Sequence, residues 1–182
     1  MGKKPIVIAV NAVSGGGKTA VTNALRQKLQ NSRAVYFDHY DDADKNIPDI
    51  TKWIEDGADY DLWELEEMAD DIAKILNTDS NADYIILDYP FGYKQKQIAE
   101  FIDLSVYIDT PADIALARRI IRDISAQTKV DEVINILTGY LRTRNTYIYS
   151  QICHEDSDMK IDGILSVEQI TGSIIKKIYE KF

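Results

Sequence analysis

A glycine-rich stretch near the start of the chain has the residues needed to hold a nucleoside triphosphate. Residues 11–19 read Asn-Ala-Val-Ser-Gly-Gly-Gly-Lys-Thr and lie between a short apolar run and an amphipathic stretch. Consecutive glycines let backbone N–H groups turn towards phosphate oxygens with no Cβ in the way. Lys18 can then reach the β- and γ-phosphates, and the Thr19 hydroxyl can ligate Mg²⁺. We therefore predict a phosphate loop that binds ATP through Ser14, Gly15, Gly16, Gly17, Lys18, Thr19 and Ala20.

This stretch departs from the phosphate-loop pattern G-x-x-x-x-G-K-[ST] at one position, because Ala12 stands at the first glycine. Alanine is acceptable there if its φ angle is negative. The alternative interpretation is a glycine-rich turn that only caps a helix. Three glycines followed by Lys-Thr, between a strand and a helix, favour the phosphate loop.

Two acidic residues follow predicted strands and could serve a metal ion or a proton transfer. Asp38 follows residues 34–37, and Asp88 follows residues 84–87. Both would lie near the phosphate loop, because the carboxyl ends of parallel strands gather at one edge of a sheet. Asp38 could accept a proton from a hydroxyl group or hold the hydration shell of Mg²⁺, and Asp88 could orient Mg²⁺. The alternatives are an acidic surface loop for Asp38 and a turn cap for Asp88.

Three arginines follow one another on a predicted helix. Arg118 and Arg122 are four residues apart, and Arg119 precedes Arg122 by three. Like charges at these spacings repel unless an anion lies between them. We predict a lid in which Arg118 and Arg122 stabilise the charge on a moving phosphoryl group and Arg119 binds the nucleotide. The alternative is a solvated helix face on which Arg119 pairs with Asp123.

Short apolar runs alternate with longer amphipathic stretches along the chain. This alternation predicts an α/β fold, a three-layer αβα sandwich with a five-stranded parallel sheet and a helical lid. The predicted strands are residues 6–10, 34–37, 84–87, 104–108 and, as the weakest run, 159–161. Four helices are predicted. The first carries Val21, Leu25 and Leu29 on one face, and the second runs from Leu62 to Leu76. The third extends from Asp113 onwards with Pro111 in its first turn, and the fourth runs from Val167 to Ile178 with Ser166 as N-cap.

Composition and charge narrow the classes of partner. The chain has 182 residues and a net charge of -9, which disfavours nucleic acid and anionic membranes. The single cysteine, Cys153, excludes an internal disulfide, and its neighbour His154 does not give it a zinc-ligand spacing. The apolar run at residues 6–10 is shorter than a signal peptide requires. We expect residues 1–182 to form one domain of a cytoplasmic protein. The sequence is compatible with a homo-oligomer.

In this order the elements resemble the uridine kinase and phosphoribulokinase family of P-loop kinases. Residues 109–113, Asp-Thr-Pro-Ala-Asp, and 117–123, Ala-Arg-Arg-Ile-Ile-Arg-Asp, are similar to the strand-then-lid signature of the family, and residues 157–163 are similar to its last strand. The resemblance implies a mobile lid over approximately residues 117–150. It also implies that Asp38 is the catalytic base and a Mg²⁺ ligand, and that Asp88 stands where the family carries a carboxylate for Mg²⁺.

The chain also departs from the family at two places. Only six residues separate Leu76 from Asp83, where uridine kinases insert a hairpin with a histidine that helps hold the pyrimidine. Residues 125–129 stand where the family continues with Arg-Gly, so one lid arginine is absent, and Lys129, Arg142 and Arg144 are the candidates to replace it. The departures leave the kinase chemistry intact and put uridine specificity in doubt.

The segment from Trp53 to Trp63 lies where the family binds its acceptor. Its carboxylates and aromatic rings suit a polyhydroxylated substrate, but they equally suit a loop capped by Asp59 or Asp61 with both tryptophans in the core.

The expected reaction is transfer of the γ-phosphoryl group of ATP to a hydroxyl of a nucleoside, sugar or vitamin-like molecule, with Mg²⁺ as cofactor. Two alternatives stay open: a nucleoside-monophosphate kinase, and a nucleotide-switched binding protein that hydrolyses ATP or GTP. The guanine-reading motif Asn-Lys-x-Asp does not occur in the sequence, which disfavours the GTPase.

Overall fold

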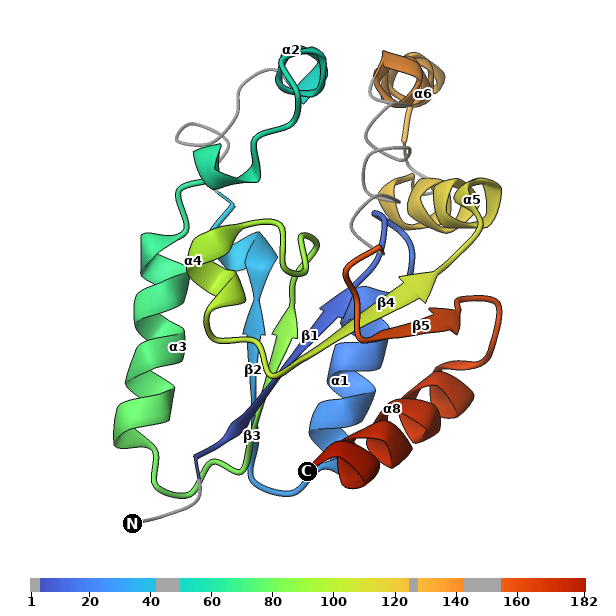
Figure 1. The fold of residues 1–182 in the computed structure, drawn as a ribbon. Helices are drawn as coiled ribbons and strands as arrows, with labels where there is room; N and C mark the ends of the chain where they lie inside the picture. Colours follow the sequence, from blue (N-terminus) through green and yellow to red (C-terminus); the bar gives the residue numbers. More distant parts are fainter. Residues whose placement is uncertain (1–3, 42–49, 125–127, 143–154) are drawn as a thin grey trace.

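A parallel sheet of five strands forms the centre of the protein (Figure 1). The computed structural model describes residues 4–41, 50–124, 128–142 and 155–182. The strands run in the order β2-β3-β1-β4-β5 and are all parallel to their neighbours. They are β1 (Ile6–Asn11), β2 (Ser32–Tyr36), β3 (Tyr84–Asp88), β4 (Leu104–Asp109) and β5 (Met159–Asp162). All five predicted strands are confirmed.

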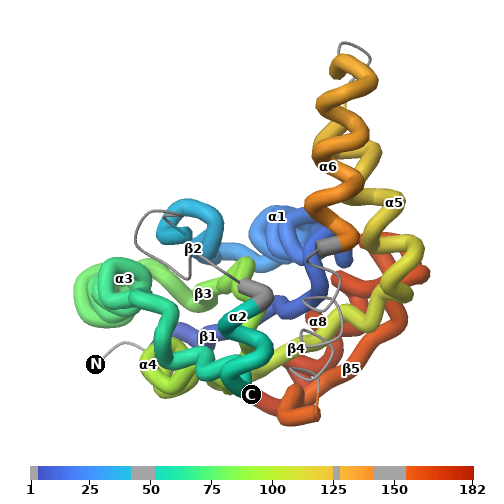
Figure 2. Tube along the Cα trace, turned by 90° about the horizontal axis from the view of Figure 1, so that it is seen from above, coloured from blue at the N-terminus to red at the C-terminus, as the bar shows by residue number. Residues whose placement is uncertain are grey.

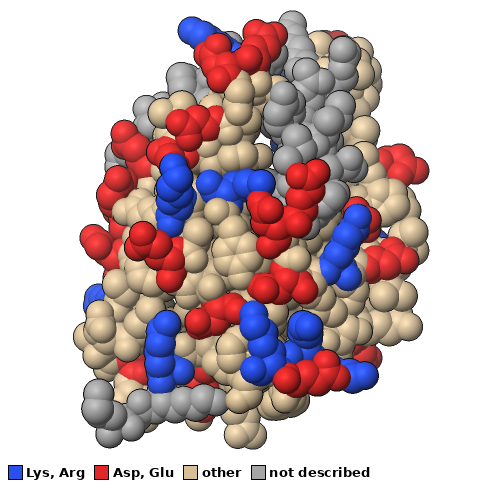
Figure 3. Space-filling view, in the orientation of Figure 1, with Lys and Arg blue, Asp and Glu red and all other residues tan. Residues whose placement is uncertain are grey.

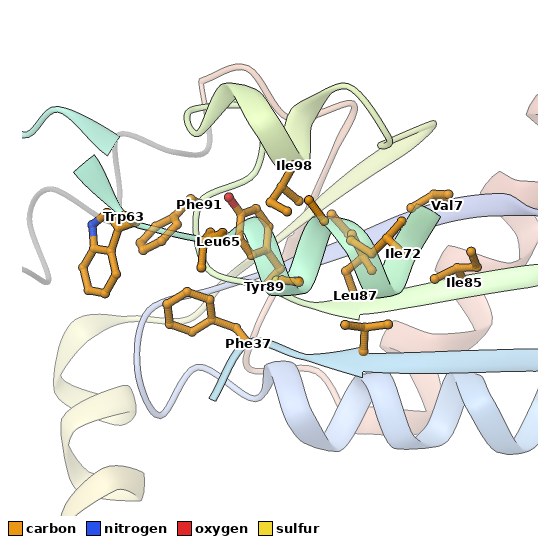
Figure 4. Close-up of a cluster of buried hydrophobic side chains, with 14 of the residues drawn as sticks. Val7, Phe37, Trp63, Leu65, Ile72, Ile85, Leu87, Tyr89, Phe91 and Ile98 are labelled. Carbon is orange, nitrogen blue, oxygen red and sulfur yellow. The ribbon is translucent and has the colours of Figure 1, made fainter. Parts of the chain in front are cut away.

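Helices cover both faces of this sheet, because alternate residues of its central strands are apolar on both sides. One face packs on α1 (Lys18–Lys28) and α8 (Val167–Lys181), whose Leu25 and Ile174 are fully buried against Ile8. The other face packs on α3 (Glu66–Thr78) and α4 (Lys96–Ala99), where Ile72 and Ile98 surround Val7 and Leu87 (Figure 4). The three-layer αβα sandwich is therefore confirmed.

Two further helices form a hairpin beside the carboxyl ends of the strands. These are α5 (Ala112–Asp123) and α6 (Val130–Arg142), and Figure 2 shows them lying side by side and projecting from the body of the protein. The short helix α2 (Ile50–Glu55) lies at the same end of the sheet (Figure 1). The helix predicted from Asp113 onwards is α5, which begins at Ala112, and the predicted lid, approximately residues 117–150, takes in the later part of α5 and all of α6. Residues 143–150 of the predicted lid, and also Cys153 and His154, lie outside the described residues.

The structure differs from the sequence prediction at three element boundaries. Leu62 does not belong to the second helix: it ends a 3-10 turn, η2 (Tyr60–Leu62), and 60% of it is exposed, whereas α3 begins at Glu66. Asp59 causes this break, because its side chain accepts the backbone N–H of Asp61 and so caps the turn. Phe37 begins the 3-10 turn η1 (Phe37–His39) after β2, and Pro111 is the N-cap of α5 and not part of its first turn.

The connection from α3 to β3 is short, as the sequence indicates. Residues 79–83 are all described, and they form a turn closed by a hydrogen bond from Ala82 N to Asp79 O at 3.1 Å, with no strand between the two elements. Among the described residues, no helix has the length and apolar character that crossing a membrane would require. Acidic and basic side chains are interspersed over the face drawn in Figure 3.

Candidate active site

The phosphate loop connects β1 to α1 and depends on its glycines for two different reasons. Gly17, the N-cap of α1, has a φ of 102°, a left-handed conformation that L side chains rarely adopt. Gly15 is packed so closely on α5 that a Cβ there would lie 2.2 Å from the Ala115 carbonyl oxygen. Ala12 is buried and is not among the described residues with positive φ, so its backbone meets the condition set by the sequence. The first turn of α1 contains no acidic residue, so its N–H groups can bind an anion.

Thr19 and Asp88 meet at the mouth of this loop, although they are far apart in the sequence. The Thr19 hydroxyl donates a hydrogen bond to Asp88 Oδ2 at 2.5 Å. Asp88 is the last residue of β3 and is 6% exposed. Burial raises the pKa of its carboxyl, while the hydrogen bond from Thr19 and the charge of Lys18 oppose that rise. An acid held this way is ready to accept positive charge from a ligand.

Lys18 lies at the centre of the charged groups of the site. Burial lowers the pKa of its ammonium; the charges of Asp88 and Asp38 oppose this, and those of Arg122 and Arg119 add to it. These four side chains therefore lie within electrostatic range of Lys18. Five of the predicted site residues, taken from four separate segments, converge on one place.

Asp38 is presented by a turn whose neighbour is anchored in the core. The backbone N–H groups of Tyr40 and Asp41 both donate to the Phe37 carbonyl, at 2.8 and 3.1 Å. The Phe37 ring is buried and packs edge-on against Phe91, with centroids 5.2 Å apart. The side chain of Asp38 is exposed, so it is accessible to a substrate.

The three arginines of α5 point to two different places. Arg119 lies against the phosphate loop: a Cβ on Gly15 would be 3.2 Å from the Arg119 Cβ. Arg122 acts with Arg119 on Lys18. Arg118 instead donates from Nη1 and Nη2 to the Gly163 carbonyl, at 3.3 and 3.4 Å. The structure thus packs Arg119 against the phosphate loop, leaves Arg122 within electrostatic range of Lys18, and ties Arg118 to the turn after β5. Ser14 and Ala20 lie in the loop and the first turn of α1.

Sequence reasoning missed Asn11, which fixes the start of the phosphate loop. Asn11 is fully buried at the end of β1. Its Nδ2 donates to Ser105 Oγ at 2.8 Å and to the Val106 carbonyl at 3.1 Å, and its Oδ1 accepts the Gly92 N–H at 3.0 Å. A polar residue ending an otherwise apolar strand was the available signal, because a buried amide must find hydrogen-bond partners.

Thr110 was missed as well, and it supports the loop from the opposite side. Its hydroxyl donates to the Gly16 carbonyl at 2.9 Å. Gly163, after β5, approaches so closely that a Cβ there would lie 1.9 Å from Thr110 Oγ1. The position of the phosphate loop is therefore set partly by the turn that follows the last strand.

The region expected to hold the acceptor is a cluster of aromatic rings. Trp53 and Trp63 are 7% and 8% exposed, and their rings meet edge-on at 6.2 Å. Trp53 Nε1 donates to the Asp59 carbonyl at 2.7 Å, and the carboxylate of Asp61 pairs with Lys96. The geometry favours the interpretation with capping acids and core tryptophans. Figure 4 shows Trp63 and Phe91 at the end of the core cluster, near Phe37, the residue that precedes Asp38 in the sequence.

The donor groups of the site fit Mg²⁺. The Thr19 hydroxyl and the Asp88 and Asp38 carboxylates are hard oxygen ligands of the kind this ion prefers. In the described part of the chain no group of three or more His, Cys, Asp or Glu side chains could hold a metal by itself. Mg²⁺ usually binds through one or two carboxylates together with phosphates and water, so these residues suit an ion that arrives with a nucleotide.

The fold and the site together indicate the class of the protein, which is an α/β protein of the P-loop kinase type. The family model described as the phosphoribulokinase / uridine kinase family matches residues 66–168, and the chain belongs to that family. It is accordingly a phosphotransferase that acts on a hydroxyl group.

Individual relatives agree with the family assignment, and solved structures agree with the fold. The chain is 30% identical over 166 residues to a uridine kinase of Bacillus pumilus, covering 78% of this chain and 79% of the relative. It is 28% identical over 166 residues to a uridine kinase of Anoxybacillus flavithermus, covering 75% and 78%. A putative fructose transport system kinase from Silicibacter shares the fold with a TM-score of 0.57 at 12% identity, covering 87% of this chain and 90% of that one. A deoxyadenosine kinase from M. mycoides does so with a TM-score of 0.50 at 14% identity, covering 96% and 100%.

Proposed function

We propose that this protein is an ATP-dependent kinase that transfers the γ-phosphoryl group to a hydroxyl of a small molecule such as a nucleoside, sugar or vitamin-like compound. The observation that carries the proposal is the contact between the Thr19 hydroxyl and Asp88, formed beside a lysine that lies within electrostatic range of two acids and two lid arginines. This arrangement supports phosphoryl transfer because catalysis of that reaction is mainly positioning and electrostatic stabilisation.

In this mechanism the phosphate loop holds the triphosphate by its backbone N–H groups, and Lys18 contacts the phosphates that react. Its partly buried ammonium gains a full set of anionic partners when the nucleotide binds. Thr19, Asp88 and Asp38 would hold Mg²⁺, which neutralises charge on the phosphates when bound. Arg119 and Arg122 stabilise the charge on the transferred group. The contacts of Arg118 favour a role in anchoring the lid to the turn at Gly163.

Asp38 is the proposed catalytic base. The acceptor oxygen forms a bond to the γ-phosphorus as the bond from that phosphorus to the ADP oxygen breaks, and the hydroxyl proton passes to Asp38. The exposed side chain of Asp38 suits this role, since it must meet a second substrate. The aromatic cluster beside Phe37 provides an apolar wall next to it.

The proposed acceptor is a small hydroxyl compound, which we do not narrow to uridine. The relatives named above are uridine kinases, but the connection between α3 and β3 has no room for a base-holding hairpin. Uridine therefore belongs in the panel of acceptors to be tested, alongside other nucleosides, sugars and vitamins.

The test has two stages. First, ADP release from ATP and Mg²⁺ is measured with each acceptor, and strong stimulation by one hydroxyl compound is expected. Stimulation by proteins alone would favour the nucleotide-switched alternative and contradict the kinase.

Second, Asp38→Asn should reduce transfer by about 10²- to 10⁴-fold while ATP affinity changes by less than about twofold, because a general base contributes that much to the rate. Asp70→Asn, an exposed acid on α3, is the matched control and should have normal activity. Unchanged turnover in Asp38→Asn would exclude Asp38 as the base.

A further inference from the structure

Asp123, the last residue of α5, makes contacts that the mechanism above does not use. Arg122 Nε donates to its Oδ1 at 2.7 Å, and Arg119 Nε donates to its Oδ2 at 3.4 Å. The hydroxyl of Tyr140, on the neighbouring helix α6, donates to the same Oδ2 at 2.5 Å. One carboxylate therefore gathers both arginines that act on Lys18, and it joins them to the second lid helix.

Tyr140 contributes its ring as well as its hydroxyl. The Arg119 Cζ lies 4.4 Å from the centroid of the Tyr140 ring, within the range of a cation–π interaction. The Arg119 guanidinium is thus held by the Asp123 carboxylate at its Nε and by an aromatic face. Its side chain is 28% exposed, as is that of Asp123.

The contacts through Nε determine how the two guanidiniums are oriented. A guanidinium has five N–H donors in a rigid plane, and only one of them belongs to Nε. A contact through Nε fixes the plane of the group and orients the Nη atoms, which are the donors that bind phosphate in pairs. Two arginines and one carboxylate also leave a net positive charge, so the group still attracts a triphosphate.

We propose that Asp123 and Tyr140 are positioning residues that hold Arg119 against the phosphate loop and Arg122 beside it, so that the contacts between α6 and α5 set the geometry of the two arginines. This inference rests on the proposed kinase function for its catalytic consequence. Its structural part, the placement of the arginines for a triphosphate, does not depend on the acceptor.

Without this carboxylate the two arginines would repel each other at a spacing of three residues on α5. They would separate towards solvent, and Arg122, whose side chain is already 62% exposed, would move most easily. Small displacements of groups that act on the transition state cost about 10²-fold in rate.

The experiment measures transfer and nucleotide binding separately in the full chain. With the best acceptor from the panel, Asp123→Asn should lower kcat by about 10- to 100-fold, a larger change than the change in the KM for ATP. Tyr140→Phe keeps the ring under Arg119 and loses only the hydroxyl, so a smaller loss of about two- to fivefold is expected. Asp131→Asn, an exposed acid on α6, removes the same charge from the lid and should leave kcat unchanged.

A double-mutant cycle separates positioning from a purely structural effect. Because Asp123 acts through Arg122 as well as Arg119, Asp123→Asn should cost clearly less in a chain that already carries Arg122→Gln than in the wild type. Additive losses in the double variant would overturn the proposal, and so would an unchanged kcat in Asp123→Asn. A gain in ATP affinity in Asp123→Asn would also overturn it, because Asp123 would then compete with the phosphates for the arginines.

A binding measurement distinguishes failure of this inference from failure of the proposed function. The affinities for ADP and for the β,γ-imido analogue of ATP need no acceptor, and in Asp123→Asn the analogue should lose at least about threefold more than ADP. Equal losses of affinity for ADP and for the analogue would overturn the proposed placement of the arginines. A larger loss for the analogue, in a protein that no acceptor stimulates, would contradict only the proposed kinase function.

Discussion

Three charged groups at the site have displaced pKa values, two of them through burial and one through a hydrogen bond. Burial lowers the pKa of Lys18 and raises that of Asp88, so each charged form is destabilised by loss of water. A hydrogen bond from Arg122 is the main cause that lowers the pKa of Asp123, to about 2. Lys18 and Asp88 are therefore incompletely compensated until a ligand supplies matching charge, whereas Asp123 is compensated by the protein itself.

The Asp123 contact should contribute measurably but weakly to stability, and with a defined pH dependence. Its folded pKa lies below the usual value of 3.8, so the stabilisation is present above that value and is lost as the pH falls towards about 2. Because the groups facing it, Arg119, Arg122 and Tyr140, are all partly exposed, solvent screening limits the contribution to about 1 kcal/mol or less.

Denaturant unfolding of the wild type and of Asp123→Asn between pH 3 and pH 6 tests this expectation. The difference in free energy of unfolding should be largest near pH 6 and should shrink as the pH falls. A difference that grows at low pH would have the wrong sign and would contradict the assigned cause.

Residue spacing alone predicted the meeting of Thr19 and Asp88, because the end of a parallel strand can only lie at the carboxyl edge of the sheet. It could not decide which arginine faces the phosphate loop. That choice depends on the rotation of α5 about its own axis, which is set by the close contact between the Ala115 carbonyl and Gly15. The conformations of the arginines follow from that contact and from Tyr140, 21 positions beyond Arg119.

At the scale of elements, the start of α8 is fixed by a capping box. The Ser166 hydroxyl accepts the Gln169 N–H at 3.2 Å, and the Gln169 side chain accepts the Ser166 N–H at 3.0 Å. These bonds satisfy two backbone donors that the helix itself leaves open. The helix then buries Ile170, Ile174 and Ile178 against the sheet.

Ser166→Ala should therefore lower the free energy of unfolding by about 1 kcal/mol. Ser173→Ala is the matched control on the same helix: its hydroxyl only donates to the Gln169 carbonyl within the helix, and its loss should be close to neutral. Urea denaturation of the two variants and the wild type gives the comparison. Equal effects of both substitutions would show that the cap contributes nothing specific.

The helices and strands with regular apolar patterns were predictable from sequence, and the segment around Leu62 was not. Periodicity placed Leu62 on the apolar face of α3. In the structure, the Asp59 side chain accepts the Asp61 N–H and caps a 3-10 turn that contains Leu62. The same limitation applied to the tryptophans. Trp53 packs on the rings of Tyr60 and Trp63, and Trp63 in turn packs on Phe37 and Phe91 from distant elements, which no local pattern reveals.

Over the whole molecule, the phosphate loop is connected to the last strand by packing and hydrogen bonds. The Thr110 hydroxyl holds the Gly16 carbonyl, and Gly163 packs directly on Thr110. The Gly163 N–H donates to the Asp109 carbonyl at 3.0 Å, and its own carbonyl accepts from Arg118. The turn after β5 thus contacts both Thr110, which supports the phosphate loop, and Arg118 of α5.

This connection predicts that one added methyl group will have opposite effects at two glycines of the same region. In Gly163→Ala the new Cβ would lie 1.9 Å from Thr110 Oγ1 and 2.8 Å from Thr110 Cα, so the backbone must shift. Overpacking of this kind costs about 2 kcal/mol. Because Thr110 supports Gly16, ATP affinity should fall as well, by about tenfold.

Gly172, exposed in the middle of α8, has no atom within 4 Å of the corresponding Cβ position. Gly172→Ala should therefore raise the free energy of unfolding by about 0.5–1 kcal/mol, through the smaller entropy of the unfolded chain, and leave ATP binding unchanged. Denaturant unfolding and calorimetric titration with ATP and Mg²⁺ measure both quantities on both variants. If Gly163→Ala lost stability but bound ATP normally, the turn after β5 would support the fold without positioning the phosphate loop, because the methyl group would then displace the turn and leave the Thr110 hydroxyl in place.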